Sequence, residues 1–271
     1  LSDQRMPGAY GNELLFYARD RYPHIVRILT TAYSELEHTV EAVNQGQIHR
    51  YIQKPWEITA LRMELKQALD LAKLRKEHAQ LLREKLLIRQ KQTVSNRIGT
   101  VYTLCASLAE PGHVLPVEAY LSAALTAGVT PPEPDWLLMD YADLISAEAF
   151  RSGAFGSAVR GQFAAMEQQH PEHTVEQAIE MLSAVFGDTL EPCGADAAVF
   201  LDERPLTEFL ETPSDAPVSS QHAFWLAFLL WLGKRAWSMQ ATRTERGLQC
   251  KLAQVEVPVT PAQLAAWVEQ F

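Results

Sequence analysis

The chain has 271 residues, 47% of them hydrophobic, and its 24 basic and 33 acidic side chains give a formal net charge of -9. This length and apolar content provide for one large domain or two ordinary ones with buried cores, which excludes a wholly disordered chain. The longest apolar run, Ala223 to Leu232, is half of the ~20 residues that a membrane span needs. We therefore expect a soluble, cytoplasmic protein. Because the sequence opens on Leu1 and not on Met, we also expect residues upstream of it.

Residues 1–56 alternate apolar segments with helical patterns, as α/β proteins do. We expect helices at 12–21 and 34–44, and strands from Ile25 to Thr30 and from His49 to Gln53. Pro55 ends the second strand because it has no N–H to donate and restricts the residue before it. These elements predict an α/β domain over residues 1–56.

Residues 57–112 have the pattern of one long helix, since Leu and Ala recur at three- and four-residue spacing with no Gly or Pro before Gly99. Such a helix outruns the roughly 8–20 residues usual in globular domains, so we expect it to pair with a copy of itself in a homodimer. His78 and Lys85 fall near the apolar seam. The alternative that the helix packs on its own domain therefore stays open.

Residues 113–271 carry 8 basic and 21 acidic side chains, a balance that repels phosphate backbones and argues against DNA as a partner. We expect helices at 116–127, 147–169, 175–186 and 221–237, the third preceded by a capping box of Thr174 and Gln177. We also expect a strand at 197–201, a hairpin at 239–257 and a last helix after Thr260. His222 is interpreted as a packing or capping histidine. The segment is predicted to be an α+β module.

Three short motifs in the first 56 residues stand in a characteristic order and spacing. They are Asp3 followed by Met6-Pro7-Gly8, the pair Thr31-Ala32, and the stretch Asn44 to Trp56, which has the pattern N-x-G-x-I-x-R-Y-I-x-K-P-W. Together they resemble the C-terminal half of the receiver domain of bacterial two-component response regulators, in one subgroup of that family. Each residue alone has an ordinary turn or strand-end interpretation, and only the set is specific.

The resemblance implies a site for phosphoryl transfer and a cognate histidine kinase as partner. Asp3 is the phospho-acceptor, Thr31 and Lys54 bind the phosphoryl group, and Thr31 with Tyr51 forms the switch. The Lys54–Pro55 bond is commonly cis in the family. Mg²⁺ is the implied cofactor, held by Asp3 and by the backbone carbonyl of Arg5. The charge of the transferred group must be neutralised, which is what a lysine, a hydroxyl and a metal supply. The family's first two strands, first two helices and acidic metal-binding pair have no counterpart here, so we expect them upstream.

The output half lacks a P-loop, a helix-turn-helix and the signatures of cyclic-dinucleotide enzymes. It vaguely resembles a histidine-kinase dimerisation domain followed by its ATP-binding domain, in a degenerate version without the catalytic residues. The expected fold is therefore an incomplete, flavodoxin-like α/β receiver, a long dimerising helix and an α+β output module that works through protein contacts, with a non-enzymatic output favoured. Two alternatives stay open: a receiver-linked enzyme or nucleotide-binding domain, and an inert pseudo-receiver scaffold.

Overall fold

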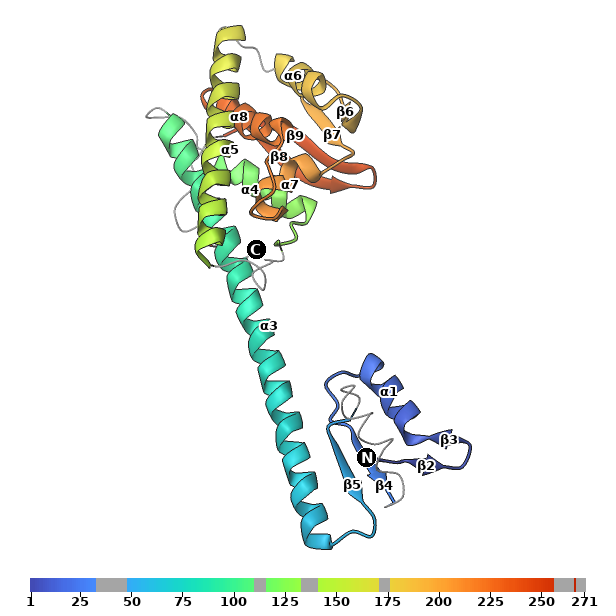
Figure 1. The fold of residues 1–271 in the computed structure, drawn as a ribbon. Helices are drawn as coiled ribbons and strands as arrows, with labels where there is room; N and C mark the ends of the chain where they lie inside the picture. The colour runs from blue at the N-terminus through green and yellow to red at the C-terminus, as the bar shows by residue number, and fades with distance from the viewer. Residues whose placement is uncertain (33–47, 110–115, 133–140, 171–175, 256–265, 267–271) are drawn as a thin grey trace. The chain divides into compact units, whose positions relative to one another are not determined.

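The structure is a computed structural model that describes residues 1–32, 48–109, 116–132, 141–170, 176–255 and 266 (Figure 1). The chain divides into two compact units, Leu1–Lys85 and Leu86–Phe271. Both contain helices and strands, so the chain is a mixed α/β protein. None of the helices in the described ranges combines the length and the apolarity of a membrane span. The division into segments 1–56, 57–112 and 113–271 stays a prediction.

The first unit contains a parallel three-stranded sheet of β1 (Ser2–Asp3), β4 (Ile28–Thr31) and β5 (Arg50–Gln53), in the order β1-β4-β5. Helix α1 (Gly11–Arg21) contributes Leu15 to a small core with Leu29 and Ile48. The expected helix at 12–21 and both expected strands are confirmed with shifted ends. The helix expected at 34–44 lies outside the described residues.

A short antiparallel ribbon, β2 (Arg5–Met6) with β3 (Ala9–Tyr10), follows β1. Its turn contains Gly8 at a φ of 82°, a left-handed conformation that glycine adopts without a Cβ penalty. The ribbon was not predicted from the sequence, because two-residue strands are too short to show a hydrophobic period.

Helix α3 (Ile58–Leu108) confirms the long helix expected after Glu57, and it continues through Gly99. Near its start it is bonded to β5: Arg50 Nε lies 2.5 Å from Glu64 Oε2, and Arg50 Nη2 donates to Gln67 Oε1 at 2.9 Å. From Val94 onward, one face of the helix is buried in the core of the second unit, through Val94, Ile98, Val101, Leu104 and Cys105. That part of the helix packs on its own unit.

The second unit contains an antiparallel sheet with the order β6-β7-β9-β8. Its strands are β6 (Leu190–Pro192), β7 (Ala197–Phe200), β8 (Trp237–Thr244) and β9 (Gly247–Gln254), and its helices after α3 are α4 (Val117–Ala127), α5 (Tyr141–Gln169), α6 (Glu176–Phe186), α7 (Arg204–Glu211) and α8 (Ser220–Gly233). Helix α8 is buried on every side and packs against α5 (Figure 1). It forms the centre of the large core.

Most elements expected in this unit are confirmed, including the hairpin, which is β8 with β9. The helix expected at 221–237 was too long: α8 ends at Gly233, Ala236 turns the chain at a φ of 57°, and Trp237 begins β8. Strand β6 and helix α7 were not predicted. The capping residue Thr174 and the helix expected after Thr260 lie outside the described residues.

Candidate functional site

The candidate site lies at the carboxyl edge of the parallel sheet. Asp3 is the last residue of β1, Thr31 is the last residue of β4, and Lys54 follows β5 directly. Because the three strands are parallel, these ends meet at one edge, where open α/β sheets place their ligand sites. The backbone continues the ladder there, since Lys54 N donates to Thr31 O at 2.8 Å.

Asp3 and Lys54 form an ion pair in which Nζ lies 2.8 Å from Oδ1. Their side chains are 46% and 40% exposed, so an incoming molecule can reach both. Hydrogen bonds from Lys54 and from Thr30 hold the pKa of Asp3 below its ordinary value. At neutral pH the site therefore presents a charged carboxylate beside a fixed cation. The Lys54–Pro55 peptide bond is cis, as in the family that the sequence resembles.

The hydroxyl that contacts Asp3 in this structure is that of Thr30. Successive side chains on a strand point to opposite faces, so Thr30 and its neighbour Thr31 cannot both face the carboxylate from regular strand geometry. The Thr31 hydroxyl donates to Ala32 O at 3.2 Å. The sequence motif contains Thr31 and not Thr30, which directly precedes it, so the sequence analysis gave Thr30 no role. The role of Thr31 in phosphoryl binding stays a prediction.

Tyr51 lies on β5 opposite Leu29 and is 42% exposed. Lys54 also lies over the ring of Trp56, with Nζ 5.3 Å from its centroid, a distance at which a cation is attracted to an aromatic face. Tyr51 lies two residues before Gln53, the last residue of β5, and Lys54 follows directly. Its role as a switch stays a prediction.

The chain bends closely around Asp3. Gly11 N donates to Gln4 O at 2.9 Å, and a Cβ atom at Gly11 would collide with the backbone carbonyl of Asp3. Only glycine fits at the start of α1 for this reason. The close approach fixes the loop that contains Arg5 next to the aspartate.

The Asp3 carboxylate and the backbone carbonyl of Arg5 stay the predicted ligands for Mg²⁺, as the family resemblance implies. Among the residues that the structure describes, no group of three or more His, Cys, Asp or Glu side chains could hold a metal ion. Mg²⁺ prefers an octahedral shell of oxygens, in which water and phosphate oxygens often complete one or two carboxylates. One carboxylate and one backbone carbonyl would fit such a shell if water and phosphate oxygens supplied the remaining ligands.

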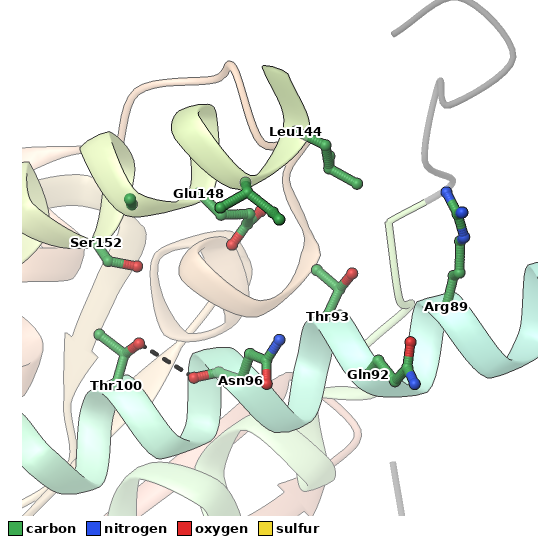
Figure 2. Close-up of a pocket in the computed structure, with 10 residues that line it drawn as sticks. Arg89, Gln92, Thr93, Asn96, Thr100, Leu144, Glu148 and Ser152 are labelled. Carbon is green, nitrogen blue, oxygen red and sulfur yellow. Dashed lines mark hydrogen bonds between the residues drawn. The ribbon is translucent and has the colours of Figure 1, made fainter. Parts of the chain in front are cut away.

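The second unit has a cavity of about 340 Å³ between α3 and α5. Figure 2 shows Thr93, Asn96 and Thr100 on α3 facing Leu144, Glu148 and Ser152 on α5, with the Thr100 hydroxyl donating to Asn96 O. Glu148 is occupied by its ion pair with Arg97, with Oε1 2.5 Å from Nη2. The walls of the cavity are of mixed polarity, with Leu144 and Ile145 among the polar side chains, and its one acidic side chain is already paired.

His222 confirms the interpretation as a packing histidine. It is fully buried, its Nδ1 donates to Pro205 O at 2.7 Å, and its Nε2 lies 2.9 Å from the Tyr120 hydroxyl. Ser219 caps α8 by accepting from His222 N.

The chain is similar over part of its length to curated bacterial regulators. It is 43% identical over 70 residues to the hydrogenase transcriptional regulatory protein HoxA of Cupriavidus necator, covering 26% of this chain and 14% of that protein. The HoxA protein of Bradyrhizobium diazoefficiens is 39% identical over 77 residues, covering 28% and 16%. The response regulator protein FleR of Pseudomonas aeruginosa is 46% identical over 61 residues, covering 22% and 13%. The chain therefore spans only a small part of the length of these relatives.

No family model matches the chain. Among solved structures, full-length FixJ from B. japonicum is 23% identical with a TM-score of 0.24, covering 47% of this chain and 52% of that chain. A structure described as adenylate cyclase from Rhodopirellula baltica is 31% identical with a TM-score of 0.29, covering 30% and 60%.

Proposed function

We propose, from the premise that this chain contains part of a response-regulator receiver domain, that it belongs to a two-component regulator and accepts a phosphoryl group on Asp3 from a cognate histidine kinase. The observation that carries the proposal is the Asp3 carboxylate at the carboxyl edge of a parallel sheet, paired with Lys54 at 2.8 Å and partly exposed. HoxA and FleR, which the chain matches over 70 and 61 residues, are named as regulatory proteins, and this supports the proposal.

In the proposed reaction, a carboxylate oxygen of Asp3 attacks the phosphorus of the donor, and the bond from phosphorus to the leaving group breaks. Catalysis of such a transfer is mostly positioning and neutralisation of charge. Lys54 supplies a compact positive charge beside the carboxylate, and Thr31 would give its hydroxyl to a phosphoryl oxygen, as the family implies. Mg²⁺, when bound, would add positive charge at the phosphoryl oxygens, with Asp3 and the Arg5 carbonyl as the ligands that this chain contributes.

The proposed output runs through β5 into α3. Arg50, next to Tyr51 on β5, is bonded to Glu64 and Gln67 of α3, so a shift at the end of β5 is transmitted to the helix. We propose that the 57–112 helix pairs with its copy in a homodimer and that phosphorylation changes the angle or register of this helix. The acidic module, residues 113–271, then acts through protein contacts and not on DNA. Its partner is a protein of opposite charge or complementary shape.

The test is phosphoryl uptake from radiolabelled acetyl phosphate with Mg²⁺ in the full-length protein. We expect the wild type to be labelled and Asp3→Asn to take up no label, while the matched control Asp20→Asn, at an exposed aspartate of α1, is labelled normally. Labelling of Asp3→Asn would overturn the assignment of the acceptor. A wild type that neither takes up label nor responds to beryllofluoride with Mg²⁺ would support the inert scaffold instead.

A further inference from the structure

Thr30 has a buried hydroxyl beside the proposed phospho-acceptor. Thr30 is 1% exposed and lies opposite Asp3 in the pairing of β4 with β1. Its hydroxyl is within hydrogen-bond distance of Asp3 Oδ1, and also of Ser2 O at 3.3 Å. A hydroxyl has one proton to donate, so it bonds one of these acceptors at a time. The carboxylate is the nearer acceptor and carries charge, and hydrogen bonds to charged acceptors are roughly twice as strong as neutral ones. The proton therefore goes to Asp3.

The same oxygen also accepts from Lys54, whose Nζ lies 2.8 Å away. Within the described part of the chain, the two donors that reach this carboxylate thus both bond Oδ1. Oδ1 is held from two directions, by a hydroxyl on β4 and an ammonium after β5. These two donors leave the lone pairs of Oδ2 available to attack another atom.

We propose that Thr30 is a positioning residue that binds Oδ1 of Asp3, directs Oδ2 at the incoming phosphorus, and sets the lifetime of the phosphorylated state. This inference rests on the proposed function and deepens it. In the unphosphorylated state, two donors fix the rotation of the carboxylate about its Cβ–Cγ bond. A group that can rotate freely would have to be ordered in the transition state, which costs rate.

The chemistry of dephosphorylation gives Thr30 a measurable effect. Water attacks phosphorus, the bond from phosphorus to Oδ2 breaks, and its electron pair returns to Asp3 as a carboxylate, while the water proton leaves with inorganic phosphate or to solvent. The returning charge is shared with Oδ1, where Thr30 and Lys54 donate. A donor aimed at the atom on which charge develops lowers the barrier of that step. Removal of the Thr30 hydroxyl should therefore prolong the life of the acyl phosphate.

The experiment compares Thr30→Val, which has nearly the same shape without the hydroxyl, with Thr30→Ser, which restores it. The full-length protein is labelled with acetyl phosphate and Mg²⁺, the donor is removed, and the first-order loss of label is followed. We expect Thr30→Val to retain label about three- to tenfold longer than wild type, the scale of losing one hydrogen bond to a developing charge. Thr30→Ser should decay within about twofold of wild type, since the donor is present again.

The first-order constant separates this role from a merely structural one. A folding defect lowers the amount of protein that is labelled, yet it leaves the decay constant of the labelled molecules unchanged. If Thr30→Val labels too weakly, Thr30→Ala gives the same measurement in a smaller side chain. Equal or faster decay in the hydroxyl-free variants, with a labelled wild type, would overturn this inference and leave the proposed function standing. A wild type that takes up no label at all would overturn both.

Discussion

At the scale of single residues, His222 shows how a buried polar group is kept neutral. Its ring is fully buried. Nδ1 donates to Pro205 O and Nε2 accepts from the Tyr120 hydroxyl, so both nitrogens are hydrogen-bonded in the neutral tautomer. Burial, with a contribution from the charge of Arg151, lowers its pKa to about 4. A charged imidazolium here would face a cation and lose hydration.

This lowered pKa predicts a loss of stability in acid. Between about pH 6.5 and pH 4 the unfolded chain binds a proton at His222 that the folded chain does not bind, so the free energy of unfolding falls as the pH falls through this window. The loss amounts to about 3 kcal/mol at most. Urea unfolding at several pH values should show a flatter profile for His222→Gln than for wild type. His24→Gln, at an exposed histidine before β4, is the control. Equal slopes in wild type and His222→Gln would contradict the argument.

The residues of the candidate site were predictable from the sequence only as far as the motif reaches. The motif placed Asp3 and Lys54 at strand ends, and the parallel pairing of the strands brings these ends to one edge of the sheet. The contact of Thr30 with Asp3 depends on which face of β4 turns toward β1, and two consecutive threonines leave that choice open in a strand of period two. The sequence therefore indicated that Asp3 and Lys54 belong to one site, but it did not indicate the contact of Thr30 with Asp3.

At the scale of elements, α3 has an exposed apolar stripe before it enters the second core. Leu74, Leu81 and Ile88 are 62%, 56% and 58% exposed and recur every seven residues. A seven-residue repeat of apolar side chains is the pattern of a coiled-coil seam. With these residues at one seam position, His78 and Lys85 occupy the other, so the seam is mixed and the pairing should be weaker than in an all-apolar coil.

The stripe predicts a dimer that one charge on the seam destabilises. Leu81→Glu would place a carboxylate at the centre of the interface and face its own copy, so we expect the dimer to dissociate at least about tenfold more readily. Gln80→Glu adds the same charge next to it at a position that faces away from the stripe and should leave the dimer intact. Sedimentation equilibrium of the two variants and wild type measures the dissociation constants. Monomeric wild type, or equal constants for all three, would contradict the homodimer.

Helices and strands were predictable where the apolar residues repeat over enough positions to show a period, or where a capping residue marks the end of the element. The hairpin β8–β9 and the end of α4 at Gly128, which is left-handed at a φ of 87°, follow from local sequence. The end of α8 did not, because Ala236 turns the chain in a left-handed conformation that its side chain disfavours, just before Trp237 begins β8. Helix α7 was missed although Leu206, Phe209 and Leu210 have helical spacing, because its eight residues are fewer than the roughly 11–18 over which a helical period is read.

At the scale of the whole molecule, the described residues have two cores of very different size. The cluster in the first unit consists of Leu15, Leu29 and Ile48, while the second unit has a continuous core that includes α8 and the antiparallel sheet. Units with separate cores unfold in separate transitions when no large interface couples them. The larger core should carry the more stable transition. Trp56 reports on the first unit, and Trp225 and Trp231 report on the second.

Arg97 on α3 joins three elements of the second unit, and its removal should destabilise that unit. It is 1% exposed, pairs with Glu148 on α5, and donates to Leu210 O at 3.0 Å and Thr212 O at 2.8 Å at the end of α7. The pairing also holds the pKa of Glu148 below its ordinary value, although burial acts to raise it. Arg97→Met keeps the apolar stem but removes the donor from two carbonyls and the ion-pair partner from Glu148, which retains a hydrogen bond from Ser214.

We expect Arg97→Met to lower the free energy of unfolding of the second unit by about 3 kcal/mol, the cost of leaving buried polar groups unpaired. The transition of the first unit should not move, since the hydrogen bonds that the structure describes for Arg97 all lie within residues 86–271. Arg83→Met, at an exposed arginine of the same helix, is the control and should change neither transition. The double variant Arg97→Met with Glu148→Leu should recover part of the loss, because it removes the stranded carboxylate. Urea unfolding followed by tryptophan fluorescence measures both transitions, and an Arg97→Met protein as stable as wild type would show that the network contributes nothing to the fold.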